Sequence, residues 1–287
     1  MKRRTWLKTG ALALAGCSLK AAETEGTSVF TAMGIAASIG DAAALQRAGA
    51  SFLTLSTDAF LVPGKDDAAF AKQLASIQGA PLPVLACNSF IRPPHLHCVG
   101  PDANHDEVLE WADTAFRRLA EARGKFIVFG SSGARRVPDG FPRAKAEKQF
   151  VELLKKMGPL AEKRGVTVVV EQLQERECNF INHIAQAASL IRAAGHPRVR
   201  VLADLYHMRV MGDTPDDLRD ALDVVEHMEI AEKAERTYPG VKGDDFRPFF
   251  KVLHEKGWKG AISIEGRGEP EQWAAAFRTI RGQSTFT

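Results

Sequence analysis

Short apolar runs alternate along the chain with longer stretches in which apolar residues recur at helical spacing. Eight such pairs follow one another from residue 29 onwards. The pattern predicts strands at Val29–Met33, Ser51–Leu55, Leu82–Ala86, Lys125–Phe129, Val166–Val170, Val199–Ala203, Val224–Ile230 and Ala261–Ile264. It predicts helices near residues 39–48, 66–78, 105–123, 144–164, 180–194, 215–222, 245–256 and 270–281.

This alternation indicates one α/β domain, which we place at residues 28–287. Eight strand–helix units in about 255 residues match the usual size of a (β/α)8 TIM barrel. The run Val166–Val170 is almost entirely apolar, as a parallel strand covered on both faces requires. A doubly wound open sheet is the alternative, but no glycine-rich dinucleotide-binding turn follows the first predicted strand. We therefore expect the barrel.

Several residues mark where the predicted helices begin and end. Ser38 and Asp213 are placed to cap helix N-termini, because their side chains can accept hydrogen bonds from free backbone N–H groups. Gly165 and Gly195 follow amphipathic stretches and are placed to end them in a left-handed conformation.

The first residues are typical of an export signal. Arg3 and Arg4 form a twin-arginine pattern, and the apolar run that follows is too short to span a bilayer. Residues 14–17 then resemble a lipobox that ends in Cys17. We expect residues 1–16 to be a signal peptide, Cys17 to be lipidated and residues 17–27 to be a tether. The alternative is an ordinary secretory signal with an incidental cysteine.

An exported lipoprotein would lie in the bacterial cell envelope, in the periplasm and anchored to a membrane by lipid. Ser18, rather than Asp, follows the lipidation site, which favours the outer membrane. Three cysteines would remain in an oxidising compartment: Cys87, Cys98 and Cys178. An odd number leaves at least one thiol unpaired, and the sequence does not decide whether Cys87 and Cys98 form a disulfide.

Composition excludes one class of partner. The chain has a formal net charge of +3, and residues 1–16 contain four basic residues and no acid, so the rest is close to neutral. No basic face with interleaved aromatic residues is present that could neutralise phosphates. We therefore expect no nucleic-acid partner.

Acidic residues lie at the carboxyl ends of the last four predicted strands: Glu171, Asp204, Glu229 and Glu265. One acid at such a place could be a helix cap or a charge on the rim. Four acids at the active-site face of a barrel would repel one another, and burial would increase that cost. A hard divalent cation resolves the conflict, because such cations prefer carboxylate oxygens. The other resolution is that one acid is protonated or points away.

Further motifs carry a family resemblance. They are residues 170–173 (VEQL), 203–208 (ADLYHM), 230–240 (IAEKAERTYPG), 243–246 (GDDF) and 262–265 (ISIE). In this order and spacing the chain resembles the sugar phosphate isomerase/epimerase group of the xylose isomerase-like TIM barrels. The resemblance extends from about Val29 to Gly268.

The resemblance implies that a Glu, an Asp, a His and a second Glu hold a metal. Carried over by position, these ligands are Glu171, Asp204, Glu229 and Glu265, so this chain has Glu where the family has His. An all-oxygen set favours Mn²⁺ or Mg²⁺, with Co²⁺ or Zn²⁺ as alternatives. His227, two residues before Glu229 on the same strand face, could replace it if the strand is bulged. The remaining interpretation is a site that has lost tight metal binding.

The resemblance also implies a reaction: isomerisation or epimerisation of a keto sugar by proton abstraction next to a carbonyl, through an enediolate. Glu171 and Glu265 would move the proton, and His207 would bind a substrate hydroxyl or help polarise the carbonyl. Arg236 could bind substrate oxygens; the equal alternative is a surface ion pair with Glu232 or Glu235.

Two other function classes remain open. One is a lyase or hydratase that acts on 3-keto-sugars or glycosides, which needs the same proton abstraction. The other is a non-catalytic, lipid-anchored sugar-binding protein. A tri-metal phosphodiesterase would need further histidines at strand ends, and the first four predicted strands offer none. A small sugar is the expected partner in each remaining case, and the sequence does not give the oligomeric state.

The segment Gly130–Arg136 follows the fourth predicted strand. It could present backbone N–H groups and arginines to an anion, although a plain loop or a contact with sugar hydroxyls is the favoured interpretation.

Overall fold

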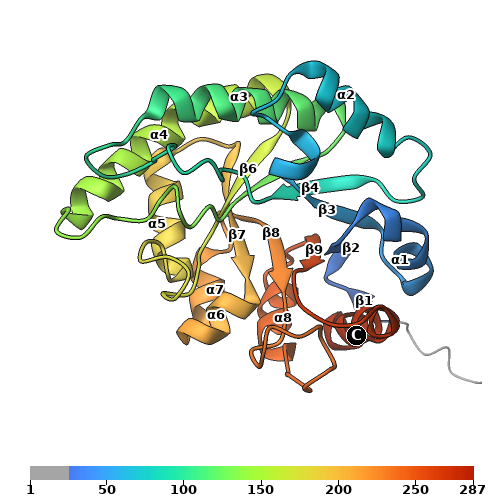
Figure 1. Ribbon diagram of the computed structural model, residues 1–287. Coiled ribbons are helices and arrows are strands. Elements are labelled where there is room, and N and C mark those ends of the chain that lie inside the picture. Colours follow the sequence, from blue (N-terminus) through green and yellow to red (C-terminus); the bar gives the residue numbers. More distant parts are fainter. Residues whose placement is uncertain (1–25) are drawn as a thin grey trace, which may run out of the picture.

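Eight parallel strands form a closed barrel in the computed structural model, which describes residues 26–287 (Figure 1). The strands are β2 (Phe30–Ala36), β3 (Phe52–Ser56), β4 (Val84–Asn88), β5 (Phe126–Phe129), β6 (Thr167–Glu171), β7 (Val199–Asp204), β8 (Val225–Ile230) and β9 (Gly260–Ile264). Each strand pairs with its neighbour in sequence, and β2 pairs with β9. The predicted TIM barrel is confirmed, and the open sheet is wrong.

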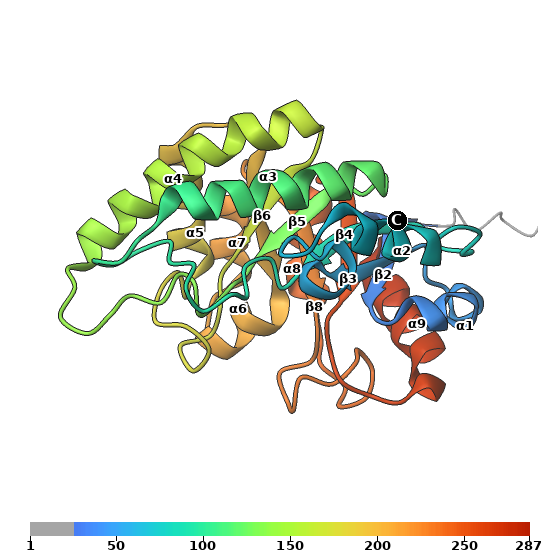
Figure 2. The ribbon, with the colours of Figure 1, turned by 45° about the horizontal axis from the view of Figure 1, so that its top comes forward.

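Helices cover the outside of this barrel. They are α1 (Ala42–Ala48), α2 (Asp67–Ser76), α3 (His105–Glu121), α4 (Arg143–Arg164), α5 (Ile184–Ala194), α6 (Leu205–Met211), α7 (Pro215–Ala221), α8 (Arg247–Glu255) and α9 (Trp273–Ser284). Shorter helical turns are η1 (Ile39–Asp41), η2 (Thr57–Leu61) and η3 (Pro270–Gln272). The long helices α3 and α4 pack side by side (Figure 2). Within residues 26–287, no helix has the length and apolar character needed to cross a membrane.

A two-stranded antiparallel sheet joins the ends of the domain. It consists of β1 (Thr27–Ser28) and β10 (Thr285–Phe286), so Thr27 at the end of the predicted tether takes part in the fold. The predicted signal peptide and Cys17 lie outside the described residues. All three cysteines in the described range are buried and free.

The lower half of the barrel interior is filled with large side chains. Phe126 and His227 stack with ring centroids 4.8 Å apart, and Phe52 lies 6.2 Å from the same imidazole. Gly34 leaves room for this layer, because a Cβ at residue 34 would lie 2.2 Å from the Phe52 ring. These rings close the barrel, so polar side chains on the same strand faces can only collect above them, at the carboxyl ends.

The helix boundaries are largely those expected. The Ser38 side chain accepts a hydrogen bond from Gly40 N, and Gly165 and Gly195 end their helices at φ of 72° and 65°. The expected cap at Asp213 is wrong, because Thr214 caps α7. Asp213 instead accepts hydrogen bonds from His183 Nδ1 at 2.6 Å and Ile184 N at 2.9 Å, which joins the start of α7 to the start of α5.

Candidate functional site

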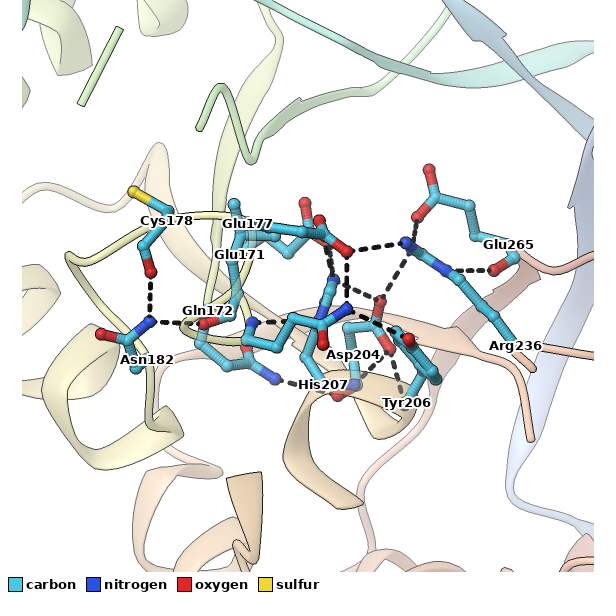
Figure 3. A network of polar contacts seen from close by, with 12 residues as sticks. Glu171, Gln172, Glu177, Cys178, Asn182, Asp204, Tyr206, His207, Arg236 and Glu265 are labelled. Atoms are coloured by element: carbon cyan, nitrogen blue, oxygen red, sulfur yellow. Dashed lines mark hydrogen bonds and ion pairs between the residues drawn. The ribbon is translucent and has the colours of Figure 1, made fainter. Parts of the chain in front are cut away.

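The four predicted carboxylates meet at the carboxyl ends of β6 to β9. Figure 3 shows three of them, Glu171, Asp204 and Glu265. Glu171 and Asp204 are the last residues of their strands, and Glu229 lies opposite Asp204 in the β7–β8 pairing. Glu265 comes directly after β9. One ligand oxygen from each residue lies within 4.8 Å of the others. The structure thus brings together the four carboxylates predicted from the strand ends.

Burial makes this group of carboxylates electrostatically expensive. The Glu229 side chain has no exposed surface, and burial together with the charge of Glu265 raises its pKa well above the usual range. Glu265 keeps 25% of its side chain exposed, and burial and the charge of Glu171 raise its pKa to about 7. Without a cation, the site is therefore most stable when it retains protons.

Several buried polar atoms of this cluster have no hydrogen-bond partner. They are both carboxylate oxygens of Glu229, Oδ2 of Asp204 and Nε2 of His207. Unpaired buried oxygens of this kind cost free energy unless a cation or a ligand satisfies them. The set of four carboxylates fits a hard divalent cation by the number and the type of its donors.

Asp204 has two functions in the local structure. Its Oδ1 accepts hydrogen bonds from the backbone N–H groups of Tyr206 and His207 and so caps α6, while Oδ2 is left for the cluster. Because α6 begins at once, His207 stands less than one turn from Asp204 and is completely buried. The helix α6 was not predicted, and it explains the spacing of these two residues.

The contacts of His207 fix the orientation of its ring. Gln174 N donates a hydrogen bond to Nδ1 at 3.2 Å, so the ring proton of the neutral form is on Nε2. Nε2 points at the cluster, 3.4 Å from Glu171 and 3.6 Å from Asp204. Burial alone would lower the pKa of this imidazole, but the charges of Asp204 and Glu171 outweigh burial and raise it. The predicted substrate-binding histidine thus lies in the site.

Arg236 also lies in the site, and the surface ion pair considered for it is wrong. Its NH2 group pairs with the Glu265 carboxylate and lies 3.6 Å from Asp204, and Nε donates to the Glu265 backbone oxygen at 3.1 Å. The guanidinium also stacks over the ring of Tyr206 at 4.7 Å. Burial opposes the charge of Arg236, but the charges of Glu265 and Asp204 outweigh it, so the pKa of Arg236 rises above its usual value.

A buried carboxylate holds the loop that carries Arg236. Glu232 is completely buried, and its oxygens accept hydrogen bonds from the backbone N–H groups of Gly240, Gly243 and Asp244 at 2.8–3.1 Å, and from that of Lys242. Glu235, the other acid considered as an ion-pair partner of Arg236, pairs with Lys242 at 2.9 Å. Arg236 itself has a φ of +56°, a strained conformation that these bonds help to maintain.

Sequence reasoning missed three residues of the site. Asn88 Nδ2 donates to Glu265 at 2.8 Å, and Glu177 lies 3.5 Å from Arg236 and 3.9 Å from His207. A Cβ on Gly130 would lie 2.3 Å from the Glu171 carboxylate, so glycine leaves room for that side chain. Asn88 ends β4 and could have been noticed as a polar strand end. Glu177 stands in a loop, where the hydrophobic pattern gives no signal.

His227 is not part of the cluster. The β7–β8 pairing shifts register near it, but Glu229 still faces Asp204, and His227 is stacked on Phe126 below. Burial lowers the pKa of this imidazole to about 3, so it is neutral.

The barrel and its four strand-end carboxylates define a class: TIM barrels with a candidate metal centre at the active-site face. The chain matches the family model described as "Xylose isomerase-like TIM barrel" over residues 42–283, and it belongs to that family. The predicted family is confirmed.

Two curated relatives share part of the chain. A mouse protein provisionally named as a hydroxypyruvate isomerase is 29% identical over 143 residues, which cover 47% of this chain and 52% of the relative. A 2-oxo-tetronate isomerase of Cupriavidus necator is 27% identical over 134 residues, which cover 46% of this chain and 52% of the relative. The chain thus spans about half the length of these relatives. Among solved structures, a Methylomonas D-allulose 3-epimerase is similar with a TM-score of 0.74 and 17% sequence identity. The match covers 91% of this chain and 100% of the epimerase chain, and it shows that the two proteins share a fold.

Proposed function

We propose that this protein is a divalent-metal-dependent isomerase or epimerase of small keto sugars. One observation carries the proposal: four carboxylates lie within 4.8 Å of one another, and the innermost, Glu229, is buried with both oxygens unpaired. A purely structural cluster would not require so many uncompensated oxygens. The names of the two curated relatives support an isomerase that acts on a small 2-oxo acid.

Glu171, Asp204, Glu229 and Glu265 would hold the cation, and their oxygens favour Mn²⁺ or Mg²⁺. When bound, the cation supplies Lewis acidity to the carbonyl oxygen of a substrate and stabilises the enediolate that forms.

Glu171 and Glu265 are the residues that move the proton. One carboxylate takes the proton from the carbon next to the carbonyl, and a carboxyl group then returns a proton to carbon. Return to the opposite face of the same carbon gives epimerisation. Return to the former carbonyl carbon gives isomerisation, with the proton of the neighbouring hydroxyl passing to the former carbonyl oxygen. In the metal-free site, burial and the charge of Glu171 raise the pKa of Glu265 to about 7, so this carboxyl group can hold a proton there near neutral pH.

Neighbouring side chains orient these groups. Asn88 and Arg236 hold the Glu265 carboxylate from two sides. His207, with Nε2–H directed at the cluster, can donate a hydrogen bond to a substrate oxygen. The guanidinium of Arg236 can bind a substrate oxygen as well, because its planar donors are already fixed by Tyr206 and Glu265.

We also propose that the protein is exported and anchored to the outer membrane of a bacterial envelope through Cys17. The support for this proposal is the twin-arginine pattern and the lipobox-like residues 14–17. Incorporation of labelled fatty acid into the full chain, compared with a Cys17→Ser variant, tests it.

The test of the activity uses metal content and isotope exchange together. The protein is loaded with Mn²⁺ and incubated in D₂O with hydroxypyruvate and with dihydroxyacetone, and deuterium at the carbon next to the carbonyl is followed by mass spectrometry. We expect exchange that EDTA abolishes and Mn²⁺ restores. Tight sugar binding without exchange would instead indicate a receptor.

A further inference from the structure

A second pocket lies beside the carboxylates, between the loops that follow β4 and β5. Its volume is about 280 Å³, and it is lined by Ser89, Ile91, Arg92, Ser131, Ser132 and Gly133. Ile91 N donates a hydrogen bond to Ser131 Oγ at 3.0 Å, which ties the two loops together across it. None of these residues has a part in the reaction described above.

The residues before the two loops connect this pocket to the site. Asn88, which donates to Glu265 at 2.8 Å, directly precedes Ser89. Gly130, which leaves room for the Glu171 carboxylate, directly precedes Ser131. A substrate held between Glu171 and Glu265 would therefore have this pocket next to it.

The chemistry of the pocket is opposite to that of the carboxylate cluster. No acidic residue lines it, and Arg92 forms no ion pair with any residue from 26 to 287. The Ser131 oxygen already accepts a hydrogen bond from Ile91, so its hydroxyl proton is free to donate. A guanidinium and three serine hydroxyls form a set rich in donors, which suits a ligand group rich in acceptors.

The backbone at the pocket is strained on both sides. Ser89 has a φ of +52° and Ser131 a φ of +38°, a region in which glycine would be free of strain. The chain has serine instead of glycine at both positions. Each serine contributes a hydroxyl group that glycine would lack. Strained conformations of this kind cluster at ligand-binding sites.

We propose that this pocket binds the carboxylate of an acidic keto sugar, with Arg92 and Ser131 as the residues that select it. The inference rests on the proposed function and narrows its substrate class to keto-sugar acids. A planar guanidinium pairs with a carboxylate through two parallel hydrogen bonds. The pocket and the cation would thus hold two adjacent groups of one substrate, the carboxylate at Arg92 and the carbonyl oxygen at the metal.

Matched substrates test this assignment. Hydroxypyruvate and dihydroxyacetone differ only in a carboxylate against a hydroxymethyl group, as do 2-oxo-tetronate and erythrulose. We expect the wild type to exchange each acid faster than its neutral partner. Arg92→Met should lower kcat/KM for the acids by about tenfold and change it less than twofold for the neutral ketoses. Ser131→Ala should act in the same direction. The control is Arg278→Met, which changes an exposed arginine on α9 and should leave kcat/KM unchanged for both the acids and the neutral ketoses.

Three results would overturn the proposal. The first is an equal loss for acid and neutral substrates in Arg92→Met. The second is no loss for either. The third is a preference for dihydroxyacetone phosphate that Arg92→Met removes, which would assign the pocket to a phosphate ester.

Failure of the proposed function would look different, because the Mn²⁺-loaded wild type would then exchange no ketose at all. Calorimetry with tartronate in the presence of EDTA tests the pocket by itself in that case. Binding that Arg92→Met weakens supports the anion pocket, and binding that the variant leaves unchanged overturns it.

Discussion

The two halves of the barrel mouth differ sharply. The strands β6 to β9 each present a carboxylate at or just beyond the carboxyl end, whereas β2 to β5 end in Ala36, Ser56, Asn88 and Phe129. All four carboxylates of the cluster therefore stand on one side. The difference means that the cation would sit off-centre, with space for a substrate over the neutral half.

The neutral half shapes the acidic one. Asn88 reaches the Glu265 carboxylate across the mouth, and Gly130 gives the Glu171 carboxylate room. Both glutamates are thus positioned by residues of the half whose strands end without an acid. The contrast predicts that proton transfer depends on the residues of the acidic half, and that the placement of those residues depends on the neutral half.

Loss of either proton-transfer residue should have the largest effect. Glu171→Gln and Glu265→Gln keep the side-chain shape and remove the base, so we expect deuterium exchange to fall by about a thousandfold. Glu226→Gln is a matched control, because Glu226 is on the outside of β8 and pairs with Lys125. Exchange within tenfold of the wild type in both site variants would contradict the assigned chemistry.

A methyl group on the neutral half should have the next largest effect. Gly130→Ala brings a Cβ to 2.3 Å from the Glu171 carboxylate, which must then move. We expect exchange to fall by about ten- to a hundredfold through this misplacement, with the fold retained. Gly282→Ala is the control, since nothing lies within 4 Å of the added carbon. Equal activity of the two variants would show that Glu171 tolerates displacement.

The acidic half could be predicted from the sequence because barrel geometry leaves little choice. A residue at the end of a parallel strand must lie at the active-site face, so Glu171, Asp204, Glu229 and Glu265 converge once the strands are recognised. The strands themselves could be predicted because their short apolar runs differ from the amphipathic pattern of the helices.

The loops could not be predicted in this way, because contacts distant in sequence determine their conformation. Arg236 stands in a loop that is held by Glu232, which binds backbone N–H groups from residues 240 to 244. The sequence predicts a local helix cap at Asp213, yet this side chain accepts a hydrogen bond from Ile184 N, 29 residues earlier. Neither interaction leaves a periodic pattern in the sequence.

The stability of the metal-free protein should depend on pH. Because the pKa values of Glu229 and Glu265 are raised, the folded state holds protons that the unfolded state releases. The stabilisation from Glu265 is complete below the usual glutamate pKa of 4.5 and is lost as the pH rises through about 7. The stabilisation from Glu229 is lost in the same direction, as the pH rises through its own raised pKa. We expect Glu229→Gln in EDTA to become more stable relative to the wild type, by about 1–3 kcal/mol, between pH 5 and pH 8. Urea denaturation at both pH values measures this, and a difference independent of pH would mean that the cluster holds no shared protons.

The smallest effect should come from the other buried polar residue of β8. His227 lies two residues before Glu229 on the same face, but it is packed against Phe126, and both its ring nitrogens lack hydrogen-bond partners. His227→Leu replaces unpaired nitrogens with carbon of similar volume, so we expect the free energy of unfolding to rise by about 1 kcal/mol or stay unchanged. Mn²⁺ affinity and deuterium exchange should be those of the wild type, in contrast to Glu229→Gln. A loss of metal in His227→Leu alone would make the histidine the third ligand and would move the centre one layer down the barrel.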